Sequence, residues 1–143
     1  MKRLTTLALA STAFLALPAL ADPQQIAADA AWNMVQRGDL VLIDVRTPSE
    51  WAMTGLPRDA HPATLQDVDF LAQARGAVLG DLAQPVAVIC RSGNRSSAAA
   101  ALLEKAGFSH VFEVNEGMSG NDVAGAGWIK RGLPVDPFIP PDN

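Results

Sequence analysis

The only cysteine of the chain, Cys90, stands at the start of a short polar loop that contains two arginines. The loop reads Cys90-Arg91-Ser92-Gly93-Asn94-Arg95-Ser96. If it curls around the sulfur, its backbone N–H groups, the start of a following helix and the guanidinium groups all favour thiolate over thiol. The same cradle suits an oxyanion such as thiosulfate, sulfate or phosphate. The pattern therefore indicates a nucleophilic cysteine, against the alternative of a small buried side chain that ends a strand.

The single cysteine also limits the chemistry. It rules out a disulfide within the chain and a metal cluster held by several thiolates. His61 and His110 lack acidic or cysteine neighbours at ligand spacing, and we expect Asp67, Asp69, Glu113 and Glu116 to be solvated surface charges. The formal net charge of −4 disfavours nucleic acid as a partner, because phosphate backbones are bound by clustered basic residues.

The elements that must position Cys90 alternate between apolar runs and amphipathic stretches. Residues 85–89 form a continuous apolar run that leads directly to Cys90, and residues 40–45 form another; such runs are typical of strands buried on both faces of a parallel sheet. Thr47, Pro48 and Glu50 have the types and spacing of a capped helix start. The remaining expected elements are helices over 24–37, 64–75 and 96–106 and a strand over 111–114. This order predicts an α/β domain with a mainly parallel central sheet flanked by helices.

The first 21 residues have the layout of a secretory signal peptide. Lys2 and Arg3 precede an apolar run, and Ala19-Leu20-Ala21 has the small-x-small pattern of a cleavage site. Removal of residues 1–21, which include Lys2 and Arg3, takes the formal net charge from −4 to −6. We expect a periplasmic protein with no membrane contact after cleavage, composed of a signal peptide over 1–21, one domain over 22–137 and a proline-rich tail over 138–143.

Several segments resemble one known family. The loop from Cys90 to Arg95 resembles the active-site loop of single-domain rhodaneses, the thiosulfate-type sulfurtransferases. Further resemblances follow in the family's order at Leu42-Ile43-Asp44-Val45-Arg46, Glu50-Trp51, Ala106-Gly107-Phe108, Val111-Phe112, Gly127-Trp128 and Gly132-Leu133-Pro134-Val135. The sequence departs from the family at Thr54-Gly55-Leu56-Pro57, where the family usually has Gly-His-Ile-Pro. The resemblance implies a rhodanese-like domain.

The resemblance also implies a reaction that needs no metal or organic cofactor, and it implies roles for individual residues. Cys90 would take the outer sulfur of thiosulfate or a similar donor as a persulfide and pass it to cyanide, a thiol or a protein acceptor. The donor would be held by Arg91, Ser92, Gly93, Asn94, Arg95 and Ser96, and either arginine could face it. Asp44, Arg46 and Glu50 would support the site structurally, and we expect Arg46 to pair with an acid such as Glu50.

Two other functions remain open at this point. Cysteine phosphatases and arsenate reductases use a related loop, but they typically place five residues between cysteine and arginine, whereas four separate Cys90 from Arg95. A rhodanese-like module could also carry a persulfide without turnover, or sense redox state. Such a sensor would need an external thiol, because the chain has no second cysteine.

Overall fold

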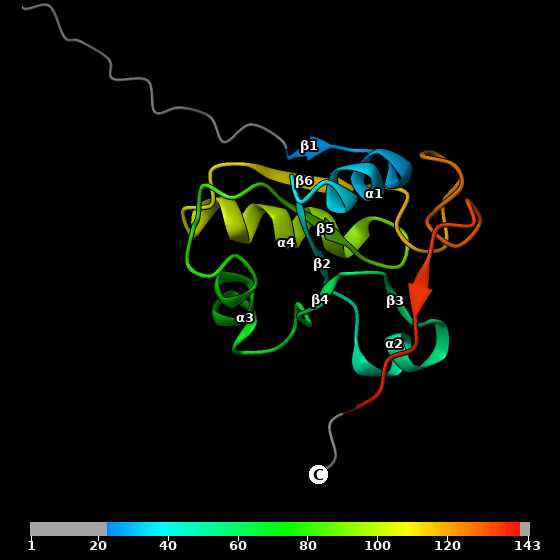
Figure 1. Ribbon diagram of the computed structural model, residues 1–143, viewed down its shortest axis with the longest axis horizontal. Helices are drawn as coiled ribbons and strands as arrows, with labels where there is room; N and C mark the ends of the chain where they lie inside the picture. The colour runs from blue at the N-terminus through cyan, green and yellow to red at the C-terminus, as the bar shows by residue number, and fades with distance from the viewer. Residues whose placement is uncertain (1–22, 141–143) are drawn as a thin grey trace, which may run out of the picture.

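A five-stranded parallel sheet forms the centre of the molecule in the computed structural model, which describes residues 23–140 (Figure 1). The predicted signal peptide lies outside these residues. The strand order is β1-β6-β5-β2-β4, with bounds Gln24–Gln25, Val111–Val114, Val86–Ile89, Val41–Asp44 and His61–Pro62. The apolar runs predicted as strands are therefore β2 and β5, two neighbours in the interior of the sheet. The mainly parallel sheet and the α/β class are confirmed.

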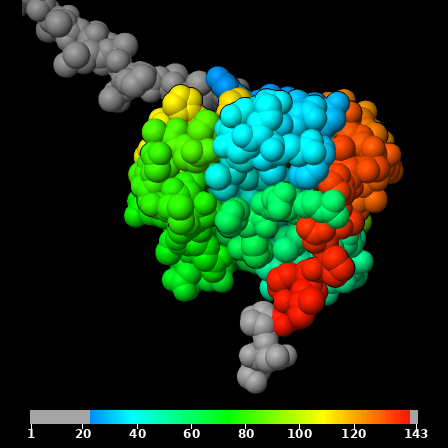
Figure 2. Space-filling model, in the orientation of Figure 1, coloured from blue at the N-terminus to red at the C-terminus, as the bar shows by residue number. Residues whose placement is uncertain are grey.

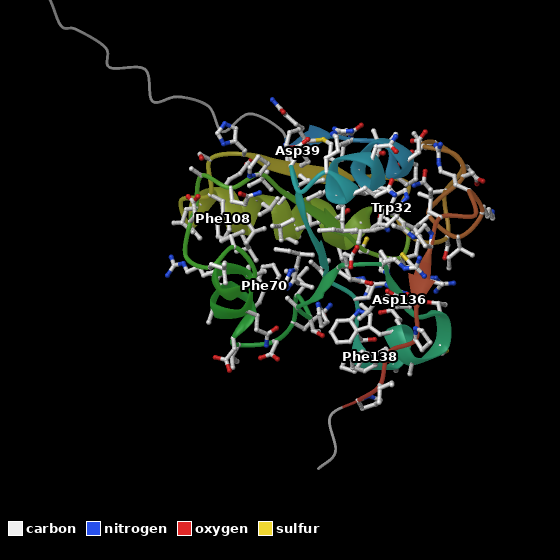
Figure 3. The ribbon with its side chains drawn as sticks, in the orientation of Figure 1. Trp32, Asp39, Phe70, Phe108, Asp136 and Phe138 are labelled. Carbon is white, nitrogen blue, oxygen red and sulfur yellow. The ribbon has the colours of Figure 1, made fainter. Side chains whose placement is uncertain are left out.

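Helices and a long loop cover the two faces of the sheet. On one face α3 (Phe70–Ala77) and α4 (Asn94–Lys105) pack against β-strand side chains; the labelled Phe70 and Phe108 lie in this layer (Figure 3). On the other face α1 (Ala28–Gln36) packs together with Trp128, and the ring of Trp32 meets that of Trp128 edge to face. Side chains that alternate along β2 and β5 therefore enter two separate apolar layers.

The helix α2 (Pro48–Thr54) starts as the sequence predicts. The Thr47 side chain accepts a hydrogen bond from the Glu50 N–H, and the Glu50 carboxylate accepts one from the Thr47 N–H, which is a capping box. This helix lies beside the C-terminal segment, whose strand β7 (Val135–Asp136) pairs antiparallel with β3 (Leu56–Pro57). The Phe138 ring contacts that of Trp51, so the C-terminal segment covers α2 (Figure 2).

Two helices begin later than the sequence pattern suggests. Instead of joining the helix expected over 24–37, Gln24 and Gln25 form β1, because they pair with β6 and the N–H of Ile26 donates to the Glu113 carbonyl. The helix expected over 64–75 starts at Phe70, because the Asp67 carboxylate accepts the Asp69 N–H and holds a turn. Within residues 23–140, no helix combines the length and apolar character needed to cross a bilayer.

Candidate active site

Cys90 follows β5 directly, at the edge of the sheet where the parallel strands β2, β5 and β6 all end. Asp44, Ile89 and Val114 lie in register across these strands. The carboxyl ends of parallel strands are the usual place for ligand sites in such sheets. Cys90 is 1% exposed, so its side chain lies beneath the loop that follows rather than on the surface.

The carbonyl groups of this loop are held by the segment that follows β6. The Cys90 and Arg91 carbonyls accept the backbone N–H groups of Met118 and Ser119, each at 2.9 Å, and the Ser92 carbonyl accepts the Asn121 side-chain amide at 3.0 Å. In a trans peptide, a carbonyl and the next N–H point in opposite directions. The N–H groups that follow these carbonyls are therefore turned away from the 118–121 segment, and the Gly93 N–H among them points at the sulfur.

Close backbone approach makes glycine necessary on both sides of this contact. Gly93 has φ +103, and a Cβ built on it would collide with the Asn115 carbonyl oxygen. Gly117 has φ +65, and a Cβ there would lie 2.5 Å from the Arg91 carbonyl oxygen. The loop can therefore press against the 115–117 segment only with glycine at these positions.

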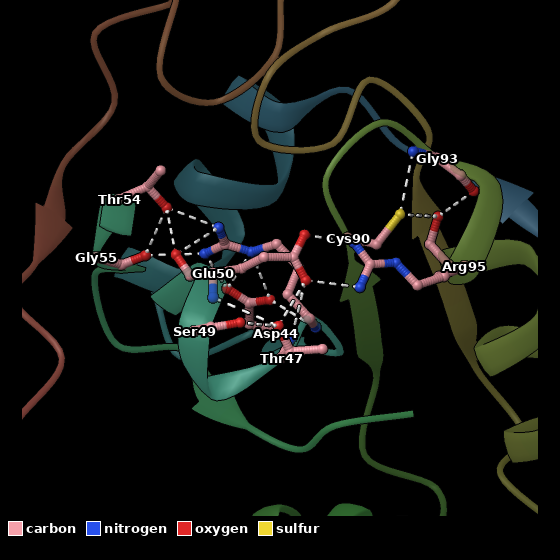
Figure 4. Close-up of polar contacts among 11 residues, drawn as sticks. Asp44, Thr47, Ser49, Glu50, Thr54, Gly55, Cys90, Gly93 and Arg95 are labelled. Carbon is pink, nitrogen blue, oxygen red and sulfur yellow. Dashed lines mark hydrogen bonds and ion pairs between the residues drawn. The ribbon is translucent and has the colours of Figure 1, made fainter. Parts of the chain in front are cut away.

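The Cys90 sulfur has two polar contacts among the described residues (Figure 4). The Gly93 N–H donates to Sγ at 3.1 Å, and Sγ lies 3.7 Å from Oγ of Ser96, a fully buried residue in the first turn of α4. Ser96 in turn donates to the Gly93 carbonyl at 2.7 Å. A backbone donor and the first turn of a helix thus surround the sulfur, an arrangement that stabilises a negative charge on it.

Arg95 is held by Glu50 of α2. Its two Nη atoms lie 2.7 and 2.6 Å from the carboxylate oxygens of Glu50, so the ion pair is bidentate. The guanidinium lowers the pKa of Glu50 to about 2, and the carboxylate raises the pKa of Arg95 above its usual value. Glu50 thus offsets much of the Arg95 charge, and α2 fixes the position of the guanidinium beside the loop.

The expectation that Arg46 pairs with an acid is confirmed, but the acid is Asp44 and not Glu50, which is taken by Arg95. Arg46 is 2% exposed and forms an ion pair at 2.7 Å with Asp44, which is completely buried at the end of β2. Arg46 also donates to Thr54 Oγ1 at 2.7 Å and to the Gly55 carbonyl at 2.8 Å. These contacts tie the end of β2 to the end of α2, so Thr54, which stands where the family usually has histidine, serves here as an acceptor for Arg46.

Arg91 differs from Arg95 in having an exposed side chain with no ion pair among the described residues. It lines a cavity of about 210 Å³ between the loop and α2. The other lining residues are Arg46, Glu50, Met53, Thr54, Met118 and Ser119. This cavity combines an uncommitted cation with the sulfur atoms of two methionines.

A second cavity, of about 470 Å³, lies where the loop meets the segment after β6. Ser92, Gly93 and the exposed Asn94 line it on the loop side, and Asp122 lines it on the other. Its lining also includes Glu113, which reaches Ser96 and Ser97 with its carboxylate. Of the residues predicted to bind a donor, the structure therefore places Gly93 and Ser96 in contact with Cys90, and it places Arg91, Ser92 and Asn94 in the linings of the two cavities.

The expectation that Glu113 and Glu116 are solvated is also wrong. They are 5% and 3% exposed, and Glu116 pairs with Arg131 at 2.9 Å. The burial of Glu113 could have been predicted from the alternation of side chains along β6, since a strand that points Val111 toward α4 also points Glu113 there. By contrast, no local pattern marks Glu116.

Comparison with known proteins identifies relatives of this domain. Residues 27–121 match the family described as Rhodanese-like domain. Thiosulfate sulfurtransferase GlpE from Pseudomonas syringae pv. syringae is 38% identical over 77 residues, which cover 54% of this chain and 67% of that protein. The uncharacterized protein RP600 from Rickettsia prowazekii is 29% identical over 121 residues, which cover 78% of this chain and 95% of that protein.

Solved structures agree with this match. The crystal structure of Rv0390 from M. tuberculosis superposes with a TM-score of 0.67 at 32% identity, covering 82% of this chain and 100% of that one. The polysulfide-sulfur transferase homodimer from Wolinella succinogenes superposes with a TM-score of 0.64 at 26% identity, covering 80% and 78%. Together with the loop around Cys90, these matches show that the chain belongs to the rhodanese-like family.

Proposed function

We propose that this protein is a periplasmic sulfurtransferase that moves a sulfane sulfur from thiosulfate or a similar donor, through a persulfide on Cys90, to a thiophilic acceptor. The observation that carries the proposal is the position of the Cys90 sulfur, at the end of β5 and 3.1 Å from the Gly93 N–H, beneath the loop that begins α4. A relative named thiosulfate sulfurtransferase supports the choice of donor. The signal-like residues 1–21 support the compartment.

In the first half of the reaction, the Cys90 thiolate attacks the outer sulfur of thiosulfate. A bond forms between the two sulfur atoms, and the bond to the sulfonate sulfur breaks, with its electron pair leaving on sulfite. In the second half, an acceptor such as cyanide attacks the outer sulfur of the persulfide, and Cys90 leaves as thiolate. The two steps share one covalent intermediate, so ping-pong kinetics are expected.

The loop stabilises the intermediate, and Arg91 attracts the donor. The Gly93 N–H lies where it can hold the negative sulfur of the thiolate or persulfide. Arg91 lines the cavity beside the loop and has no carboxylate partner among residues 23–140, whereas Arg95 is engaged by Glu50. Arg91 is therefore the cation available to the sulfonate group of the donor, and Arg95 shapes the loop from beside it.

Thiocyanate formation from thiosulfate and cyanide tests the proposal. The purified chain from Asp22 onward should form thiocyanate, and Cys90→Ser, which replaces the sulfur by a hydroxyl oxygen of similar size, should form none above background. Equal activity in both proteins, or none in the reduced wild type, would overturn the sulfurtransferase proposal. Hydrolysis of an aryl phosphate that depends on Cys90 would assign the loop to phosphatase chemistry instead.

The intact mass of the protein distinguishes an enzyme from a persulfide carrier. If Cys90 gains one sulfur atom that cyanide removes only once, without turnover, the protein is a persulfide carrier and not an enzyme.

Expression of the full chain in a Gram-negative host tests the compartment, and it should yield a periplasmic protein that starts at Asp22. Retention of residues 1–21 in the cytoplasm would contradict the periplasmic assignment.

A further inference from the structure

Glu113 is a buried carboxylate that lies against the first turn of α4 without an ion-pair partner. It accepts hydrogen bonds from Ser97 Oγ at 2.7 Å and from Ser96 Oγ at 3.1 Å. No lysine, arginine or histidine among the described residues lies within salt-bridge distance of it. Three other well-shielded carboxylates, by contrast, each pair with an arginine: Asp44, Glu50 and Glu116. Among the described residues, the Glu113 carboxylate thus has only hydroxyl groups as hydrogen-bond partners, at the first turn of α4.

Ser96 connects this carboxylate to Cys90. The serine hydroxyl has one proton, and both of its other close neighbours, the Gly93 carbonyl and Glu113, are acceptors. When the proton goes to either of them, the Ser96 oxygen presents lone pairs to Cys90 and accepts the thiol proton at a sulfur–oxygen distance of 3.7 Å. The two contacts place the Cys90 sulfur and Glu113 Oε1 no more than about 7 Å apart.

We propose that Glu113 acts through Ser96 as a positioning residue that sets whether Cys90 is a thiol or a thiolate, with one negative charge shared between the carboxylate and the sulfur. In the resting form, Glu113 is a carboxylate and Cys90 a thiol. In the reactive form, the S–H bond breaks as Ser96 receives that proton and passes its own to Glu113, which becomes a carboxylic acid. The net charge of the three residues is unchanged, and no other reactant is needed.

The physical basis is competition for the single proton of Ser96. A carboxylate accepts that proton strongly, so while Glu113 is charged the Ser96 oxygen turns a lone pair toward the sulfur, which opposes a negative charge there. Once Glu113 is protonated, it no longer demands the Ser96 proton, and the Ser96 hydroxyl can then donate to the thiolate. A neutral group in place of Glu113 should therefore increase the fraction of Cys90 that is thiolate.

Other charged groups near Glu113 provide the control. Asp122 lines the same cavity and forms no side-chain hydrogen bond with Ser96 or Cys90 among the described residues. Arg95 on α4 is engaged by Glu50, and β1, which pairs with β6 at Glu113, contributes the uncharged Gln24 and Gln25. Asp122→Asn thus removes one carboxylate charge from this cavity by the same isosteric change as Glu113→Gln. It leaves the connection through Ser96 intact.

The test measures alkylation of Cys90 by iodoacetamide at pH 7, together with thiolate absorbance in the ultraviolet. This inference rests on the proposed function only for the role of the thiolate in sulfur transfer, because neither measurement requires that reaction. Glu113→Gln keeps an oxygen within reach of both serine hydroxyls, but an amide is a weaker acceptor than a carboxylate, so the Ser96 proton is freer to turn to the sulfur and the alkylation rate should rise by about tenfold. Asp122→Asn should stay within about twofold of wild type, and Glu113→Asp, which keeps the charge, should react more slowly than Glu113→Gln.

Ser96→Ala tests the route. In that background, Glu113→Gln should change the alkylation rate by a much smaller factor, because the hydroxyl that links the two groups is gone. An unchanged or slower rate in Glu113→Gln would overturn the proposal. A full tenfold effect in the Ser96→Ala background would also overturn it, since the charge would then act directly through space. A sulfur-transfer defect with these alkylation results intact would count against the proposed function alone.

Discussion

Gly93→Ala should damage both the stability and the chemistry of the protein, because the site needs a left-handed, side-chain-free residue at this position. Gly93 has φ +103, a conformation that costs an alanine about 1–2 kcal/mol. The new Cβ would also collide with the Asn115 carbonyl oxygen, and relief of that collision adds about 1–3 kcal/mol. We therefore expect a loss of about 3 kcal/mol in the free energy of unfolding.

Gly38→Ala is the matched control. Gly38 follows α1, has φ +75 and would present its Cβ to open space, so alanine there bears the backbone cost without the collision. Its expected loss is about 1 kcal/mol, with unchanged thiocyanate formation, since Gly38 lies outside the loop and the cavities beside it.

The two variants are compared by urea unfolding, followed by tryptophan fluorescence, and by thiocyanate formation. Relief of the collision must move Gly93 away from Asn115 and with it the N–H that lies 3.1 Å from Cys90 Sγ, so kcat/KM should fall at least about tenfold in Gly93→Ala, equivalent to ~1.4 kcal/mol. Equal stability of the two variants would refute the argument from close approach. Wild-type kcat/KM in a correctly folded Gly93→Ala protein would refute the role given to the N–H.

Two further predictions concern the charges beside the loop. Arg91→Ala should raise KM for thiosulfate about tenfold and leave the free energy of unfolding unchanged, because this side chain lines a cavity and makes no ion pair among the described residues. Arg95→Ala should lower both kcat/KM and the free energy of unfolding, because it leaves the Glu50 carboxylate without its partner. A loss of stability in Arg91→Ala would contradict this distinction between the two arginines. The second prediction follows from the pKa of Glu50, lowered from 4.5 to about 2: the ion pair stabilises the fold by about 1 kcal/mol above pH 4.5, and this contribution is lost as the pH falls toward 2. Urea unfolding of wild type and Glu50→Gln between pH 6 and 2 measures it, and a constant difference between them across this range would exclude the mechanism.

The sequence predicts the centre of this fold better than its edges. The apolar runs before Asp44 and Cys90 mark β2 and β5 because strands buried on both faces need apolar side chains at every position. Gln24 and Gln25 have no such pattern, since a two-residue edge strand exists only through its pairing with β6. Local residue types cannot specify an element whose hydrogen bonds all go to a segment nearly 90 residues away.

The candidate site shows the same division between local and distant contacts. The strand, loop and helix around Cys90 are adjacent in sequence, so their spacing indicates a nucleophile. The partner of Arg95 is Glu50, 45 residues earlier, and it came into reach only when β2 and β5 paired. Period-two alternation in β6 predicts that Glu113 faces α4, but only the pairing of β5 with β6 brings it to Ser96.

The electrostatic character of the loop therefore differs between the sequence and the fold. In the sequence, Arg91 and Arg95 flank Cys90 without a nearby acid and suggest a strongly cationic cradle. In the fold, Glu50 neutralises Arg95 from α2, and Glu113 brings a second carboxylate to the start of α4. What remains to stabilise a negative sulfur is the Gly93 N–H, the helix start and the exposed Arg91. The N–H dipoles of the loop and of the helix start are not neutralised by the acids that the fold brings in. They therefore contribute a larger share of the thiolate's stabilisation than the sequence, with its two arginines, suggests.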